Sequence, residues 1–434
     1  MNKRNRFNYI ALIFVLVIIA GVVFALAMLS SSLRAGKEHE DKPDEVSLLM
    51  SWWGNDARHL YTMEGVDGYQ EKNPGIVVDY RYGEWNGYEK RTKVWMESNN
   101  EADVMQINYA WISEYSPDGT GFYDLYELSD YIDLDSFTEE ELSYGEKNGK
   151  LNALPIAMNT HTFYYNQDVL DAYGLSIPKS WDDLFAMAKV LAPEGKYVLG
   201  MAKKQTFLFL IAYYEQSSGK QFFDEDGSLV IDEAGLTELL KFYRSLIDEH
   251  VLCPVDHFDR SEYMSGTYAG TMCWISDTKI YCDGLAETGV RVTRGMYPKL
   301  AGATRSGWYV KPATMWAINA DTDHPEEAAK LLNYLLTDPD MVTLQQTEKG
   351  VPVSDAAVAV LMEEGLDQTN EYKATQEMNE HQEEFSLIIP NMENENIIDA
   401  FKSGADEYLF DNQSVEDCAK EIRKEMLDII TAQE

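Results

Sequence analysis

The sequence lacks the short motifs that mark common enzyme classes. It contains no G-x-S-x-G, no H-E-x-x-H and no Rossmann glycine pattern. The segment Gly145–Lys150 has neither the spacing nor the hydroxyl residue of a phosphate-binding loop. Carboxylate pairs are frequent, but 74 acidic residues make chance pairs inevitable. We therefore expect a protein that is not an enzyme and that carries no cofactor and no metal.

Basic residues are scarce. The chain has 36 Lys and Arg against 74 Asp and Glu, a net charge of −38. Such a charge repels phosphate backbones and anionic membrane surfaces, which excludes nucleic acid as a main partner. It also keeps a protein soluble.

Cysteine is rare as well, with four residues in the chain: Cys253, Cys273, Cys282 and Cys418. The even number allows one or two disulfides, and four buried thiols fit equally well. None lies near the N-terminal apolar segment, which excludes a lipid-modified N-terminal cysteine. Cys253 with His250 and His257 has zinc-type donors, but Pro254 interrupts that segment.

One long apolar run is present, Tyr9–Leu29, and basic residues precede it. Its 21 uncharged residues match a membrane span and exceed a usual signal segment. Residues 1–35 are therefore either a long cleaved signal peptide or an uncleaved membrane anchor. Both interpretations export the chain that follows, which begins with a polar tether at residues 36–45.

The body of the chain opens with a strand–helix–strand pattern. Strands are predicted at Val46–Trp53, Ile76–Tyr82 and Glu101–Ile107. A helix lies between the first two, with Asp56 as its predicted cap and an end at residues 73–75. Two glycines, at positions 65 and 68, are expected to weaken this helix. The pattern indicates an α/β fold.

Later helices have clear start signals. Ser180 and Asp183 form a predicted capping box. Pro325 opens a helix that Asp338-Pro339 should end, and Ser414 caps the last helix. No linker separates two independent domains, so the expected domains are interleaved.

Tryptophans follow three successive predicted strands. Trp52-Trp53 ends the first, Trp85 follows the second, and Trp111 follows the third. In open α/β sheets, ligands bind outside the carboxyl ends of strands. A sugar ring needs flat aromatic surfaces for its C–H faces and polar side chains for its hydroxyls. The alternative is that individual tryptophans belong to the core.

These segments, in this order, resemble the carbohydrate-binding extracellular proteins of ABC importers, the group that includes maltose-binding protein. The resemblance covers residues 46–434. The segments that carry it are Trp52–His59, Asn73–Val78, Asp103–Asn108, Leu154–Asn159, Tyr164–Asn166, Ser180–Leu184, Gly266–Met272, His324–Ala329 and Lys349–Ser354.

The resemblance implies a two-lobed, periplasmic-binding-protein-like α/β clamshell with a hinge. The N-terminal lobe would comprise residues 46–158 and 289–337, and the C-terminal lobe residues 159–288 and 338–434. The chain would cross between lobes near Met158, Thr288 and Thr337. Ligand would lie between the lobes, which would close on it.

The ligand-binding residues expected from the resemblance are Asn55, Asp56, Arg58, Asn108, Tyr109, Trp111, Asn159, Trp274, Asp277 and Trp308. The strand-end argument adds Trp53, Trp85 and Lys311.

The resulting prediction is a monomeric extracellular subunit that binds a carbohydrate, expected to be an oligosaccharide, and delivers it to the permease of an ABC transporter. A sensor that presents the sugar to a membrane receptor kinase is the main alternative. An exported carbohydrate-active enzyme is a third possibility and would need two carboxylates facing each other across a cleft.

Overall fold

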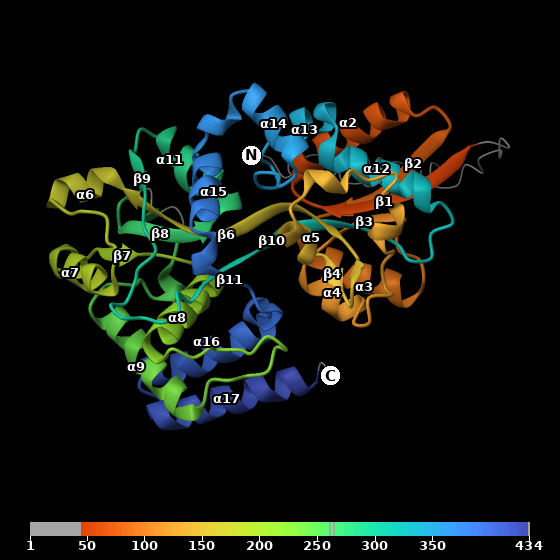
Figure 1. Ribbon diagram of the computed structural model, residues 1–434. Coiled ribbons are helices and arrows are strands. Elements are labelled where there is room, and N and C mark those ends of the chain that lie inside the picture. Colours follow the sequence, from red (N-terminus) through yellow and green to blue (C-terminus); the bar gives the residue numbers. More distant parts are fainter. Residues whose placement is uncertain (1–44, 260–261, 264, 433–434) are drawn as a thin grey trace, which may run out of the picture. The chain divides into compact units, whose positions relative to one another are not determined.

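The computed structural model describes residues 45–259, 262–263 and 265–432 (Figure 1). The predicted signal peptide or anchor, and nearly all of the tether, lie outside the described residues. Within the described part of the chain, no helix combines the length and the apolarity that a membrane crossing needs.

A nine-stranded sheet organises the fold. Its main order is β2-β1-β3-β10-β6-β8-β7, with β11 beside β10 and β9 beside β6. The strands are β1 (Val46–Trp53), β2 (Ile76–Gly83), β3 (Val104–Ile107), β6 (Leu154–Asn166), β7 (Tyr197–Leu199), β8 (Tyr268–Trp274), β9 (Val292–Arg294), β10 (Trp308–Ile318) and β11 (Phe385–Leu387). A separate hairpin joins β4 (Glu146–Lys147) to β5 (Lys150–Leu151).

The two longest strands, β6 and β10, connect the two halves of this sheet. The C-terminal part of β10 pairs with β3, and its N-terminal part pairs with β11. The N-terminal part of β6 pairs with β10, and its C-terminal part pairs with β8 and β9. All residues of β6 are buried, as expected for a strand covered on both faces.

Helices cover the sheet. They are α2 (Asp56–Lys72), α3 (Trp85–Glu97), α4 (Ala110–Tyr115), α5 (Glu139–Ser143), α6 (Gln167–Tyr173), α7 (Trp181–Leu191), α8 (Lys203–Ser218), α9 (Glu233–Asp248), α11 (Gly284–Ala286), α12 (Pro325–Thr337), α13 (Pro339–Gln345), α14 (Asp355–Glu363), α15 (Asn370–Glu380), α16 (Glu395–Leu409) and α17 (Val415–Thr431). Two 3₁₀ turns matter below, η5 (Ile275–Asp277) and η9 (Pro390–Glu393).

Most predicted helix ends are confirmed. Ser180 and Asp183 form the capping box of α7, α12 begins at Pro325, and Ser414 caps α17. The cap of α2 is a correction, because Asn55 and not Asp56 holds that position. The Oδ1 atom of Asn55 accepts a hydrogen bond from a backbone N–H of the first turn at 2.9 Å.

The third strand is shorter than predicted. It begins at Val104 and not at Glu101. The side chain of Asp103, just before the strand, accepts a hydrogen bond from the backbone N–H of Leu49 at 2.7 Å. A side-chain contact therefore replaces the ladder contact expected there.

The two glycines do not interrupt α2, which runs unbroken to Lys72. A Cβ atom added to Gly65 would lie 2.3 Å from Sδ of Met341, and one added to Gly68 would lie 3.3 Å from Oη of Tyr334. The glycines therefore let α12 and α13 pack closely on α2. Tertiary packing outweighs the local cost of glycine in a helix.

Among the described residues, hydrophobic cores form on both halves of the sheet, and two of them position the site. The larger core gathers side chains from the C-terminal part of β6 and from α7, α8, α9, α16 and α17. The smaller core gathers side chains from β1, β3, α3, α4 and the C-terminal part of β10. Figure 1 shows α16 and α17 beside α8 and α9. This arrangement confirms the predicted α/β class.

Candidate functional site

Three of the predicted tryptophans meet at the ends of β1 and β3. The ring of Trp53 lies 5.0 Å from that of Trp85 and 5.8 Å from that of Trp111. The rings of Trp85 and Trp111 stack at 6.0 Å. Trp53 and Trp111 are buried in the smaller core, whereas Trp85 is 40% exposed. Only Trp85 therefore offers a substantial ring surface to a ligand.

The predicted turn Asn55–Arg58 lies at the start of α2. Asn55 and Asp56 are exposed, and the Asn55 side chain is engaged in capping the helix. The Nε atom of Arg58 donates a hydrogen bond to the backbone carbonyl of Glu348 at 2.8 Å. Arg58 thus ties α2 to the segment after α13.

The loop after β3 brings Tyr109 to both cores. The side chain of Asn108 accepts a hydrogen bond from the backbone N–H of Ala110 at 2.9 Å, which shapes the start of α4. Tyr109 is half-buried and packs against side chains of both the smaller and the larger core. Burial raises the pKa of Tyr109 to about 12, so its hydroxyl is neutral at physiological pH.

A second group of side chains gathers where β6, β8 and β10 run side by side. In the strand registers, Asn159 on β6 opposes Lys311 on β10, and His161 opposes Trp274 on β8. Directly opposed residues share one face of a sheet, and so do residues two apart on one strand. We call Asn159, His161, Trp274, Lys311 and Glu393 the crossing cluster.

The aromatic part of the crossing cluster is Trp274. Its ring stacks on the imidazole of His161, with centroids 3.8 Å apart and an angle of 29°. The Nζ atom of Lys311 lies 4.7 Å from the centroid of the Trp274 ring. Trp274 is partly exposed, so part of its surface can contact a ligand.

Asn159 and the turn after β8 hold each other in place. The Nδ2 atom of Asn159 donates to Oγ of Ser276 at 3.0 Å, and its Oδ1 accepts from the Ser276 backbone N–H at 3.3 Å. Asp277, another predicted ligand residue, is the last residue of this turn, η5. The pairing places the turn beside the crossing strands.

The charged part of the crossing cluster is a largely buried ion pair. The Nζ atom of Lys311 lies 2.7 Å and 2.6 Å from the two carboxylate oxygens of Glu393 in η9. Their side chains are only 11% and 16% exposed. Burial alone would raise the pKa of Glu393, but Lys311 and the nearby Lys204 of α8 hold it below the usual value. Glu393 is therefore ionised.

His161 is neutral within this cluster. Burial, reinforced by the positive charges of Lys311 and Lys204, lowers its pKa to about 3. Its buried Nε2 atom has no hydrogen-bond partner among the residues that the structure describes. A neutral imidazole has one donor and one acceptor nitrogen.

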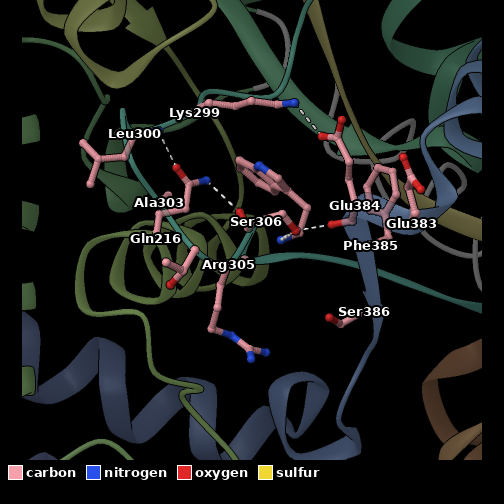
Figure 2. A pocket seen from close by; sticks show the side chains of 13 residues that line it. Gln216, Lys299, Leu300, Ala303, Arg305, Ser306, Glu383, Glu384, Phe385 and Ser386 are labelled. Carbon is pink, nitrogen blue, oxygen red and sulfur yellow. Dashed lines mark hydrogen bonds and ion pairs between the residues drawn. The ribbon is translucent and has the colours of Figure 1, made fainter.

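Trp308 lies apart from the crossing cluster, in the larger core. It is 4% exposed, and its ring packs edge-on against Phe163 at 5.7 Å. It also lines a cavity of about 430 Å³ formed by residues 299–300, 303–308 and 383–386 together with Gln216. Figure 2 shows Lys299 reaching across this cavity to Glu384, with 2.6 Å between their charged atoms.

The structure therefore brings Asn159, Trp274 and Lys311 together and joins Trp53, Trp85 and Trp111 in a second group. Sequence reasoning missed His161, Glu393 and Lys204. His161 could have been found, because it lies two residues after Asn159 on a buried strand and so shares its face. The other two come from segments far away in the sequence, and no local pattern points to them.

The crossing cluster combines a partly exposed indole, an amide, a neutral imidazole and a balanced ion pair. An indole offers a flat apolar surface, and the polar groups offer both donors and acceptors. Such a set suits reversible binding of a ring-shaped, hydroxylated molecule.

Comparison with known proteins places the fold and the family. A designed cysteine esterase is 29% identical and superposes with a TM-score of 0.81, over 90% of this chain and 100% of that one. A periplasmic oligogalacturonide-binding protein from Yersinia enterocolitica, solved with saturated digalacturonic acid, is 29% identical with a TM-score of 0.78, over 90% of this chain and 100% of that one. The two-lobed, periplasmic-binding-protein-like class predicted from the sequence is thereby confirmed.

An arabinooligosaccharide-binding protein from Bacillus subtilis is 25% identical over 249 residues, which are 55% of this chain and 55% of that protein. The family model described as "Bacterial extracellular solute-binding protein" matches residues 64–379, well over half of the chain. This protein belongs to the bacterial extracellular solute-binding protein family.

Proposed function

We propose that this protein binds an oligosaccharide outside the cell and delivers it to the membrane permease of an ABC importer. The observation that carries the proposal is the crossing cluster, where Trp274 provides an aromatic surface beside Asn159, His161 and Lys311. Family membership and the two oligosaccharide-binding relatives support it.

Binding would take place between two lobes, with the crossing strands β6 and β10 as the hinge region. In this proposal, Trp85 and Tyr109 face the ligand from the N-terminal lobe, and the crossing cluster faces it from the other side. Closure would bury the sugar and create the surface that the permease recognises.

The lobes are proposed as residues 46–158 with 289–337 and residues 159–288 with 338–434. One adjustment is favoured by packing. The helix α13 packs on α2, and Gly65 of α2 meets Met341 of α13. We therefore propose that the third crossing lies after Gln345 and not near Thr337.

The remaining parts of the proposal concern location and partners. We propose export, with the protein either anchored by residues 9–29 or released after cleavage; the N-terminal sequence and membership of an extracellular family support export. We also propose that the protein is a monomer. The sensor role remains the main alternative, and co-purification with permease subunits from membranes would distinguish the two.

A thermal-shift screen tests the binding function. The purified protein is heated with digalacturonate, arabinooligosaccharides, maltooligosaccharides and their monosaccharides. Each sugar is then recovered, and its molecular mass is determined by mass spectrometry. A rise in Tm that depends on sugar concentration, with the sugar recovered intact, is expected. A sugar that is consumed would establish an enzyme instead, and no shift with any sugar would overturn the carbohydrate proposal.

A variant pair tests the site. Asn159→Ala removes an amide of the crossing cluster and should weaken binding by about tenfold, as expected for one lost hydrogen-bonding group. Asn333→Ala is the matched control. Asn333 lies on α12, away from the cluster, and its side-chain amide accepts a hydrogen bond from the Asp133 backbone N–H at 2.9 Å. Equal affinity of the two variants would exclude Asn159 from the site.

A further inference from the structure

Lys349 is a buried lysine whose amine has no counterion among the residues that the structure describes. Its side chain lies in the segment between α13 and α14 and is 2% exposed. Its Nζ atom has no hydrogen-bond partner in the part of the chain that the structure describes. A buried ammonium normally has a paired charge or several acceptors, because leaving water without them is costly.

The neighbouring acidic residue, Glu348, does not form an ion pair with Lys349. The carboxylate of Glu348 pairs with Lys279 instead, and its backbone carbonyl accepts the hydrogen bond from Nε of Arg58. The positive charge of Arg58 adds to burial in lowering the pKa of Lys349. The local field around the amine is therefore positive and favours a negative partner.

Two aromatic rings flank the amine. Its Nζ atom lies 4.7 Å from the centroid of the Trp316 ring and 5.9 Å from that of Tyr61. Aromatic faces at this range attract a cation, which favours the charged form of Lys349. The Trp316 ring supplies no acceptor to the three N–H groups, and the buried Tyr61 hydroxyl makes no hydrogen bond to the described residues.

Further unpartnered polar atoms lie next to Lys349. Trp316 on β10 directly opposes Gln106 on β3, so their side chains share one face of the sheet. The indole N–H of Trp316 and both amide atoms of Gln106 are buried and lack partners among the described residues. We call Lys349, Trp316, Gln106 and Tyr61 the Lys349 cluster.

The unpartnered atoms of the cluster are mostly donors. The ammonium has three N–H groups, the indole one, the amide two and the Tyr61 hydroxyl one O–H, against two acceptor oxygens, those of the Gln106 amide and the Tyr61 hydroxyl. Water would satisfy some of these groups but would not compensate the charge. A partner that only accepts hydrogen bonds and carries one negative charge matches both the donors and the ammonium.

We propose that the Lys349 cluster binds one small monovalent anion of the size of chloride. The anion would neutralise the buried ammonium and accept hydrogen bonds from the indole and amide N–H groups. It would thereby hold the segment after α13, which Arg58 and Lys279 already contact through Glu348, against the sheet. This site is distinct from the crossing cluster and does not depend on the sugar-binding proposal.

Anion exchange at constant ionic strength tests the site. The full-length protein in detergent is moved from sodium gluconate into increasing sodium chloride, with sodium formate and sodium sulfate as parallel series. Chloride is expected to raise Tm by a few degrees along a saturating curve, with formate similar and sulfate ineffective. A Tm that is the same in chloride and gluconate would overturn the proposal and indicate a neutral Lys349.

Variants link the effect to the amine. Lys349→Met should abolish the chloride dependence, whereas Lys330→Met should retain it. Lys330 is the matched control, because its Nζ lies 5.0 Å from the Tyr131 ring but its side chain is 40% exposed. A chloride response that survives in Lys349→Met would place the anion elsewhere.

A structural measurement covers the case in which Lys349→Met fails to fold. Crystals of the unaltered protein grown in bromide would show an anomalous scattering peak beside Nζ of Lys349. Absence of that peak at full data quality would overturn the proposal.

Trp316→Phe retains an aromatic ring and removes the indole N–H. It should raise the half-saturating chloride concentration severalfold.

Discussion

Replacing Glu393 by Gln should destabilise the protein strongly, although the change removes only a charge. The carboxylate lies 2.6–2.7 Å from Nζ of Lys311, and both side chains are largely buried. At an effective dielectric constant of about 20, the attraction of such a pair is on the order of 6 kcal/mol. Most of this attraction is offset by the free-energy cost of removing the two charges from water.

The loss on mutation exceeds the net contribution of the pair, because it leaves Lys311 charged and buried. Removing one partner of a buried pair costs about 3–5 kcal/mol. The Trp274 ring still supports the ammonium from 4.7 Å, so the lower end, about 3 kcal/mol, is expected. Replacing both partners, as Lys311→Met with Glu393→Met, should cost much less than Glu393→Gln alone.

Urea denaturation followed by circular dichroism and by tryptophan fluorescence measures these changes. Asp171→Asn is the control, because it removes an exposed partner of Arg291 and should leave the midpoint nearly unchanged. A loss below about 1 kcal/mol for Glu393→Gln, or a double variant as unstable as the single one, would refute the reasoning.

The same pair gives a signed pH dependence. The folded pKa of Glu393 is held below its unfolded value, so its stabilisation is present above about pH 4.3, the usual glutamate pKa. It is lost as pH falls through the folded pKa. Unfolding at pH 3 and pH 7 should therefore show a smaller difference between Glu393→Gln and the unaltered protein at the lower pH.

Three further predictions concern other sites. Trp274→Ala should weaken sugar binding about 5- to 150-fold with little change in Tm. Trp308→Ala should instead lower the free energy of unfolding by about 3–5 kcal/mol, because it leaves a cavity at a core position. Calorimetric titration and thermal unfolding of both variants check these two outcomes. Burial raises the pKa of Glu371 to about 7, so between about pH 4.5 and 7 the carboxyl is protonated in the folded state and ionised in the unfolded state. The free energy of unfolding should therefore fall as pH rises through this range. Glu371→Gln should remove that fall, which thermal midpoints measured across the range would show. Gly307→Ala should destabilise the protein, because φ is +69° there and a Cβ atom would lie 2.5 Å from the backbone oxygen of Ala212; a circular dichroism melt no lower than that of the unaltered protein would contradict this.

Local signals in the sequence were sufficient for the α/β class and for most helix ends. Ser180 and Asp183 predict the start of α7 because the capping hydrogen bonds join residues three apart. Pro325 and Ser414 act within a single turn in the same way. The packing role of Gly65 and Gly68 could not be predicted, because it depends on helices that pack against them from elsewhere in the chain.

The sequence by itself thus determined the class of fold, the family resemblance and three members of the crossing cluster, Asn159, Trp274 and Lys311. It could not separate core tryptophans from exposed ones, since Trp53 and Trp85 occupy similar strand ends but only Trp85 is exposed. Burial depends on which distant segments pack against a side chain, and no local spacing encodes that. Only the tertiary structure brought Glu393 to Lys311 from 82 residues away and left the Lys349 amine without a hydrogen-bond partner in the described part of the chain, because charges meet through the packing of the whole chain.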